Sequence, residues 1–206
     1  MATKTKESKK IRDLIRIGVF SALWIAVSWI IACTVGFFPL ILLVLPCILA
    51  VAGALILVVM LSKVNIPGGI LISSFLFGIC LFSMVPYGLM FICTFAGGII
   101  GEIVYNTAGK KNNAGKVIAI SFPLFGLALG EYIPLCYMQE AFKSFYADRF
   151  TGSVADTGME LINTPLVIIL TVITVICAIL GYFWGKKIAA SRMVNQGGYK
   201  NGKSNK

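Results

Sequence analysis

The sequence feature that most constrains the fold is an unbroken run of uncharged residues from Ile17 to Ser62. One helix needs only about 20 apolar residues to cross the hydrocarbon core of a bilayer, so this run is long enough for two spans. Gly36 and Pro39 mark a turn between them. The chain is 58% hydrophobic and only 13% charged, whereas soluble domains carry about 25% charged residues. The sequence therefore predicts an integral membrane protein.

The remaining apolar segments extend this pattern along the chain. Polar breaks at Lys63, at Lys110–Lys116 and between residues 139 and 164 separate further runs that are long enough to cross a bilayer. Pro86 and Gly88 divide the third span from the fourth, and each of these two is slightly short. We predict an all-α integral membrane protein with six transmembrane helices, at about residues 17–35, 40–61, 66–85, 87–105, 117–138 and 165–184.

The positions of the basic residues predict how the chain is oriented. With six spans, all of the 18 Lys and Arg residues except Lys143 and Arg149 fall on the side that holds both termini. Positively charged segments stay in the cytoplasm. We therefore expect a basic N-terminal segment (1–16) and a basic, disordered tail (186–206) to flank the membrane domain (17–185) on the cytoplasmic side. The net charge of +10 then reflects topology and contact with anionic lipids of the bilayer, not a nucleic-acid-binding face.

Several kinds of chemistry are excluded by what the sequence lacks. The chain contains no histidine, so Ser-His-Asp, Cys-His and HExxH sites are ruled out. The six cysteines all fall inside apolar spans and form no CxxC pair, so we predict no metal site, no cofactor and no disulfide framework. No loop has the Gly-x4-Gly-Lys-Ser/Thr spacing of an ATPase. The sequence predicts a protein that is not an enzyme, and if ATP powers it, a partner hydrolyses the nucleotide.

Only two acidic residues, Glu102 and Glu131, fall within the predicted spans. A carboxylate in hydrocarbon is costly, so each is a candidate functional group. Glu102 lies within one turn of the cytoplasmic end of its span, where it can reach lipid headgroups or pair with Lys110 or Lys111, and we favour a structural role for it. Glu131 lies deep in the outer half of the bilayer. We expect it to bind a ligand, and a hydrogen bond to a neighbouring helix is the alternative.

Other polar and aromatic side chains lie at the same depth as Glu131. We predict that they complete a small-molecule pocket around it; these residues are Trp29, Thr34, Tyr87, Tyr132, Tyr137 and Asn163. For each aromatic residue taken alone, anchoring at the membrane interface is the ordinary explanation. No Lys or Arg falls in the outer half of any span, which favours a neutral or cationic ligand. The outer loop (139–164) is predicted to cover the pocket as a lid or to form an amphipathic helix at the interface.

Small residues recur at four-residue spacing on the first span. Gly18, Ala22 and Ala26 share one helix face, on which another helix can pack closely. Similar pairs occur at Ala50/Ala54, Gly97/Gly101, Gly126/Gly130 and Gly181/Gly185. Because the pattern is common in this chain, packing between its own helices is the ordinary explanation for each occurrence.

Two segments of the chain resemble a known family of membrane transporters. The segment Arg12–Ala26 (RDLIRIGVFSALWIA), after a basic start, resembles the opening of the substrate-binding (S) components of energy-coupling factor (ECF) transporters. The segment Gly130–Leu135 (GEYIPL) and the polar loop after it look like the MptD-type, or Trep_Strep, branch. The size, the six spans and the inside termini are similar too, and the resemblance extends to about residue 188.

This resemblance implies a mechanism and a set of partners. Members of the family capture a vitamin or similar micronutrient near the outer face of the bacterial cell membrane. They deliver it inward together with a membrane coupling protein and two ATP-binding cassette ATPases, and are thought to topple in the bilayer as they do so. In the family an Ala-x3-Ala pair on the first helix faces the coupling protein. Ala22 and Ala26 match this pair in place, with Gly18 on the same ridge.

Two other functions fit the same residues. A stand-alone secondary transporter of a small neutral or cationic solute would use Glu131 to carry a proton or a cation. A membrane assembly protein without transport activity would bind no ligand and would tolerate the substitution Glu131→Ala.

Overall fold

The computed structural model describes residues 2–35, 39–64, 66–146 and 162–201. Every regular element in these ranges is helical, which confirms the predicted all-α class. The elements are α1 (Ala2–Val35), α2 (Pro39–Leu61), α3 (Gly69–Leu81), η1 (Pro86–Gly88), α4 (Leu89–Val104), η2 (Tyr105–Gly109), α5 (Asn113–Tyr137), α6 (Gln139–Tyr146) and α8 (Thr164–Asn201). The short η1 is a 3-10 turn before α4, and η2 is a π-helical turn that continues α4.

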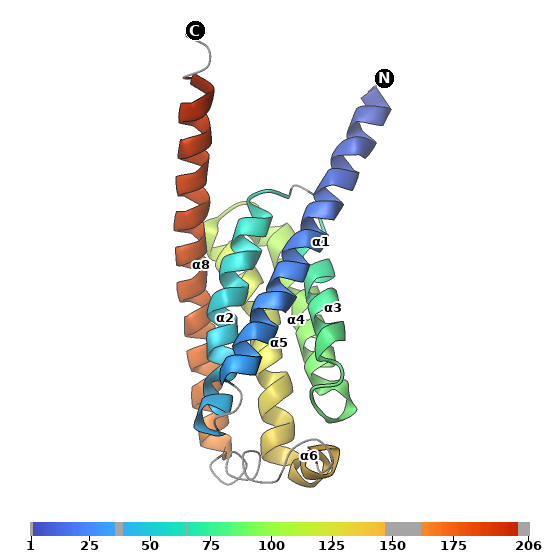
Figure 1. The fold of residues 1–206 in the computed structure, drawn as a ribbon, viewed down its shortest axis with the longest axis vertical. Helices are drawn as coiled ribbons and strands as arrows, with labels where there is room; N and C mark the ends of the chain where they lie inside the picture. Colours follow the sequence, from blue (N-terminus) through green and yellow to red (C-terminus); the bar gives the residue numbers. More distant parts are fainter. Residues whose placement is uncertain (1, 36–38, 65, 147–161, 202–206) are drawn as a thin grey trace.

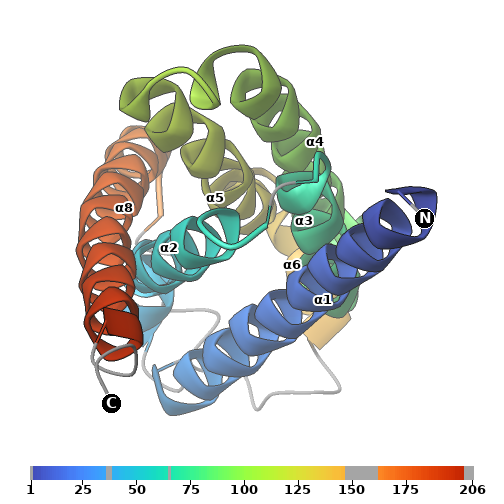
Figure 2. The same ribbon diagram turned by 90° about the horizontal axis from the view of Figure 1, so that it is seen from above.

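The long helices form one bundle in which successive helices alternate in direction (Figure 1). Both termini therefore lie at the same end of the bundle, and α6 lies across the opposite end. Seen from the end that carries the termini, α2 lies between α1 and α8 (Figure 2). α4 packs against both α3 and α5, and α5 also contacts α2 and α8. The core of the bundle is centred on Trp24 of α1, whose ring stacks on that of Phe77 of α3 with centroids 4.1 Å apart.

Within the described residues, five helices are long and apolar enough to cross a membrane. They cover Glu7–Thr34, Leu43–Leu61, Pro86–Gly109, Asn113–Tyr137 and Thr164–Ser191. This confirms a membrane protein with several spans. The prediction of a full span at 66–85 is corrected by the structure, because the helix found there, α3, has only 13 residues. Gly68 before it adopts a left-handed φ of 94°, and Val85, which precedes Pro86, is extended as residues before proline usually are.

The C-terminal segment also differs from the sequence prediction. We expected the last span to end near residue 184 and the tail from 186 onward to be disordered, but α8 continues to Asn201. The segment from Lys186 to Gln196 contains no Pro or Gly and is rich in Lys, Ala, Ile, Arg and Met, several of which are strong helix formers. Nothing in this segment stops the helix, and α8 also continues through the glycine pair Gly197-Gly198.

Candidate functional site

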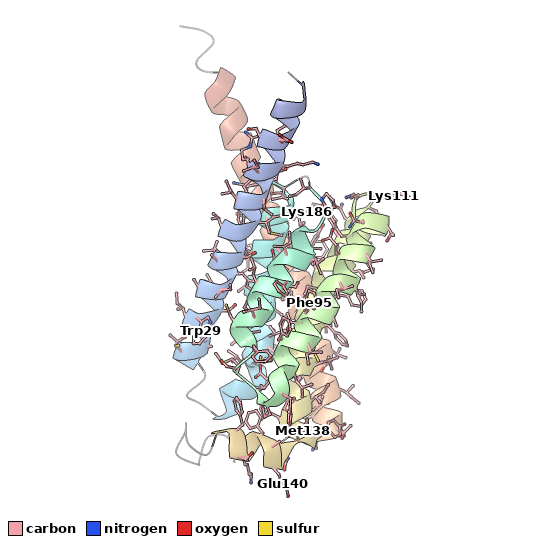
Figure 3. All side chains as sticks on the ribbon, turned by 90° about the vertical axis from the view of Figure 1, so that its right-hand side faces the viewer. Trp29, Phe95, Lys111, Met138, Glu140 and Lys186 are labelled. Carbon is pink, nitrogen blue, oxygen red and sulfur yellow. The ribbon has the colours of Figure 1, made fainter. Side chains whose placement is uncertain are left out.

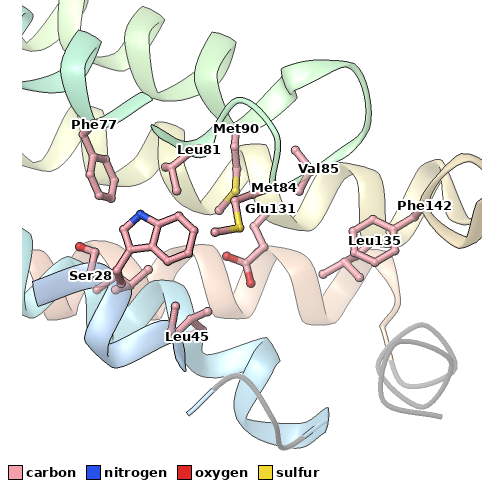
Figure 4. A pocket seen from close by; sticks show the side chains of 13 residues that line it. Ser28, Leu45, Phe77, Leu81, Met84, Val85, Met90, Glu131, Leu135 and Phe142 are labelled. Atoms are coloured by element: carbon pink, nitrogen blue, oxygen red, sulfur yellow. The ribbon is translucent and has the colours of Figure 1, made fainter. Parts of the chain in front are cut away.

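A pocket of about 100 Å³ lies toward the end of the bundle that α6 crosses, away from the termini. Figure 4 shows its lining in close-up. Residues from α1 to α6 and from the turn before η1 contribute to its walls, which are apolar or aromatic except at two positions. The lining consists of Ser28, Trp29, Ala32, Leu45, Leu49, Phe77, Leu81, Met84, Val85, Met90, Glu131, Leu135 and Phe142.

Glu131 is the only charged group in this lining. It lies on α5, one turn before Pro134, and its side chain is 5% exposed. Its carboxylate projects into the pocket between Leu45 and Met84 (Figure 4). Neither of its oxygens has a hydrogen-bond partner, and the hydroxyl of Ser28, also buried in the lining, has none either. Burial of an unpaired carboxylate is costly, so this site is prepared for a group that can donate to it.

Glu102, the other glutamate within the predicted spans, has very different surroundings. Its Oε1 accepts hydrogen bonds from the backbone N–H of Gly68 (2.7 Å) and from Asn106 Nδ2 (2.7 Å), and its Oε2 accepts one from the N–H of Ile70 (3.1 Å). The carboxylate therefore caps the N-terminus of α3, where negative charge is favourable. Lys110 Nζ donates to Asn106 Oδ1 (2.6 Å), so the expected lysine reaches Glu102 only through Asn106. This geometry gives Glu102 a structural role.

Of the aromatic residues predicted to surround Glu131, only Trp29 lines the pocket. Its side chain is 43% exposed, so it stands at the edge of the pocket and not in its depth. Tyr132 is fully buried, but its hydroxyl donates to the backbone oxygen of Leu43 (2.8 Å) outside the pocket. Because Tyr132 follows Glu131 directly on a helix, the two side chains point about 100° apart.

The other predicted pocket residues are not brought to Glu131. Thr34 donates back to the carbonyl oxygens of its own helix, at Ile30 (2.9 Å) and Ile31 (3.0 Å). Tyr137 donates to Thr164 Oγ1 (3.1 Å) on the surface, and Asn163 Oδ1 accepts from the N–H of Leu166 (3.0 Å) at the start of α8. Tyr87 is 71% exposed and occupies a left-handed turn, with φ of 57°. Spacing along the chain predicted that these residues lie at a similar depth in the membrane, but none of them lines the pocket.

The structure adds pocket residues that sequence reasoning missed. Ser28 continues a buried stripe on α1 with Ser21 and Trp24, and their helical spacing places the three residues on one face of the helix. The thioethers of Met84 and Met90 and the ring of Phe77 carry no polar signal in the sequence. They are found only through the packing of α4 against α3 and α5.

The outer loop is described in part. Residues 139–146 form α6, which confirms a short helix in the stretch where an amphipathic one was predicted, with Phe142 buried against the pocket and Glu140 exposed. Figure 3 shows Glu140 at the end of the molecule opposite Lys111 and Lys186. Residues 147–161, on which the predicted lid depends, lie outside the described residues.

The small-residue ridge of α1 faces outward. Gly18, Ala22 and Ala26 are all exposed, whereas Ser21 and Trp24 of the same helix face the core. A Cβ atom built on Gly18 would have no atom within 4 Å. This ridge therefore packs against no other described helix of the chain.

The other small-residue pairs pack inside the bundle. Cβ atoms on Gly97 and Gly101 of α4 would meet backbone oxygens of α5, and those on Gly126 and Gly130 would meet the backbone of α4. Cβ atoms on the pair at Gly181/Gly185 would meet the backbone of α2, and Ala50 and Ala54 are fully buried. Packing within the chain accounts for these four pairs and does not account for the ridge on α1.

Comparison with known proteins identifies the family. Residues 11–191 match the sequence model of Trep_Strep, which is described as a hypothetical bacterial integral membrane protein family. No curated protein and no solved structure matches the chain significantly. The match covers the bundle from α1 to the apolar part of α8, and it includes both the pocket and the outward-facing ridge. The chain therefore belongs to the Trep_Strep family of bacterial integral membrane proteins.

Proposed function

We propose that this chain is the substrate-binding subunit of an ATP-driven importer of the ECF type in the bacterial cell membrane. It captures a vitamin or similar small micronutrient in the pocket beside Glu131. It delivers this substrate inward together with a membrane coupling protein and two ATP-binding cassette ATPases. The observation that carries the proposal is the ridge of Gly18, Ala22 and Ala26, whose small residues allow close helix packing and which has no described helix of this chain against it.

The proposed topology has six crossings and cytoplasmic termini. α3 alone spans only about 20 Å, less than the ~30 Å hydrocarbon core, so it crosses together with the turns on either side of it. The alternation of the helices in Figure 1 supports an even number of crossings. Lys111 and Lys186 lie at the end that carries the termini (Figure 3), which supports a cytoplasmic location for that end. The pocket then lies in the outer half of the bilayer, where it can receive a solute from outside.

The ridge on α1 supports a docking role because a surface that faces only lipid does not need small residues. Hydrocarbon tails pack equally well against large side chains, and exposed positions of α1 elsewhere are occupied by Leu14, Val19 and Ile30. Small residues at four-residue spacing instead allow two helix backbones to approach closely. A second membrane protein is the partner that such a surface suits. The sequence also has no nucleotide-binding loop, so an ATP-driven cycle requires partner ATPases.

The proposal is tested by disrupting the ridge with bulky side chains. We expect the double substitution Ala22→Trp/Ala26→Trp to abolish copurification of the coupling protein and the ATPases from native membranes. A matched control is Ala96→Trp/Ile100→Trp, which places the same two side chains at exposed positions of α4. Both variants should keep the wild-type melting temperature in detergent, because all four positions face outward. Retention of the ATPases by the ridge variant, or their absence from the wild type, would contradict the proposal.

A stand-alone secondary transporter is the second candidate. The observation that favours it is a set of buried polar groups in the bundle interior that have no hydrogen-bond partner, namely Trp24 Nε1, Ser28 Oγ, Ser74 Oγ, Thr94 Oγ1 and the Glu131 carboxylate. Such groups can support the passage of a proton or a polar solute. Uptake driven by a proton gradient in vesicles that contain only this chain would favour this candidate over the importer subunit.

A further inference from the structure

We infer that the pocket beside Glu131 binds the protonated nitrogen of a small organic cation, such as an alkylammonium group whose remaining surface is apolar. This inference deepens the proposed function, on which it rests for the role of the ligand as a transported substrate. The site itself is argued from the charge, walls and size of the pocket.

The charge of the pocket is uncompensated. The two oxygens of Glu131 have no hydrogen-bond donor, although the side chain is 95% removed from solvent. Among the described residues, the lining contains no Lys or Arg. Its other polar groups are the hydroxyl of Ser28, which is also without a partner, and the indole N–H of Trp29, whose side chain is 43% exposed. Glu102 shows that the same chain supplies donors where a buried carboxylate has a structural role. At Glu131 a bound ligand would have to provide the hydrogen-bond donor. A protonated nitrogen provides both this donor and a charge opposite to that of the carboxylate.

The walls suit an organic cation better than a metal ion. Alkali and alkaline-earth cations bound by proteins need several oxygen ligands, and among the described side chains of the lining only Glu131 and Ser28 carry oxygens. Among the described residues, no group of three or more His, Cys, Asp or Glu residues gathers at any point. The lining instead includes aromatic residues, which can attract a cation, and the thioethers of Met84 and Met90, which offer polarisable contacts to an aliphatic body.

The size of the pocket limits the ligand. The pocket of about 100 Å³ is smaller than a cavity of about 150 Å³ in an engineered protein of another fold, which holds one benzene molecule, so the pocket suits a small group. A short alkylammonium ion, or the cationic end of a longer molecule, is of this size. A complete fused-ring vitamin is too large for the pocket as it stands.

The inference is tested by calorimetric titration of the purified full-length chain in detergent at pH 7. The probes are n-butylammonium, n-butanol and butyrate, which are short aliphatic molecules of similar size and differ in charge. We expect butylammonium to bind at least tenfold more tightly than butanol, and butyrate not to bind. Equal affinity for butanol, or no saturable binding of butylammonium, would overturn the inference. Displacement of butylammonium by an equal concentration of sodium ion would also overturn it, because the site would then bind inorganic cations.

Three variants locate the effect at the pocket. Glu131→Gln should weaken butylammonium binding at least tenfold and leave butanol binding unchanged. Glu140→Gln removes the same charge from an exposed position on α6 and should leave both affinities unchanged. Met84→Lys places an ammonium group beside Glu131 (Figure 4) and should abolish butylammonium binding even if Glu131→Gln folds poorly. Unaltered binding in a folded Glu131→Gln or Met84→Lys variant would show that the cation binds elsewhere and would overturn the inference.

The assay contains no ATPase or coupling protein, so its outcome is separate from that of the ridge experiment. Loss of the ammonium preference with retention of ATPase copurification would reject the ligand class and leave the importer subunit standing. Ammonium binding without any copurifying ATPase would support the pocket and reject the importer subunit.

Discussion

Glu102 and Glu131 carry the same side chain within the same bundle, and their surroundings assign them different roles. Three donors from Gly68, Ile70 and Asn106 converge on Glu102 and hold the turn before α3 to the end of α4. No donor from the described residues reaches Glu131, which projects into a pocket with apolar walls. One carboxylate therefore stabilises the fold, and the other is expected to lower stability at the proposed binding site, as functional residues often do.

This difference predicts opposite effects of the two residues on stability. Glu102→Ala leaves the N–H groups of Gly68 and Ile70 without their acceptor, so we expect the free energy of unfolding to fall by about 2 kcal/mol. Glu131→Gln replaces an unpaired buried carboxyl group with an amide of nearly the same shape, so the free energy of unfolding should stay the same or rise. Unfolding in mixed micelles with increasing denaturing detergent measures both. A loss at Glu131→Gln as large as that at Glu102→Ala would show that Glu131 has a structural partner.

At the scale of the element, the sequence predicted the depth of each residue better than the direction in which it points. Spacing along a span placed Trp29, Thr34 and Tyr137 in the outer part of the bundle, but only Trp29 lines the pocket. In a soluble helix, polarity marks the exposed face, whereas in a membrane both the lipid-facing and the core-facing sides are apolar. The buried face of α1, with Ser21 and Ser28, therefore could not be separated in advance from the exposed ridge.

The helix ends also separate features that the local sequence determines from features that depend on how the helices pack. Pro67-Gly68 and Pro86 were visible in the sequence, and they account for the shortness of α3. Their effect was underestimated because apolar residues continue on both sides of each break. The six apolar segments and the buried position of Glu131 could be predicted, since they depend on composition and spacing alone. The contribution of Met84, Met90 and Phe142 to the pocket depends on how α4, α5 and α6 pack together.

The glycines of the bundle provide a test of how the helices pack. A Cβ atom at Gly126 of α5 would collide with the backbone oxygen of Cys93 on α4, so Gly126→Ala should force these helices apart. We expect the free energy of unfolding to fall by about 1–3 kcal/mol. Gly18→Ala is the matched control, because a Cβ there meets nothing and Ala has the higher helix propensity, so this variant should not lower the free energy of unfolding. The same detergent titration measures both variants, and equal effects would contradict the close packing of α4 and α5.

At the scale of the whole molecule, two features lie at different places on one bundle. The pocket with Glu131 lies toward the end that α6 crosses, away from the termini. The ridge of Gly18, Ala22 and Ala26 runs along the outside of α1, whose opposite face contributes Ser28 to the pocket. α1 is therefore the element through which a partner docked on the ridge could respond to the state of the pocket. This arrangement suits a subunit that captures a solute at one face and depends on another protein for its release.

The most direct test of this account is crosslinking from the ridge in native membranes. A photo-crosslinking amino acid is placed at Ala22, and in a control at the exposed Ala96 of α4, in the otherwise unchanged chain. After illumination, mass spectrometry of the adducts should identify one membrane coupling protein at Ala22, together with its associated ATPases, and only lipid at Ala96. If Ala22 and Ala96 both yield only lipid adducts, the ridge faces the bilayer and the chain is not the docked subunit of an importer.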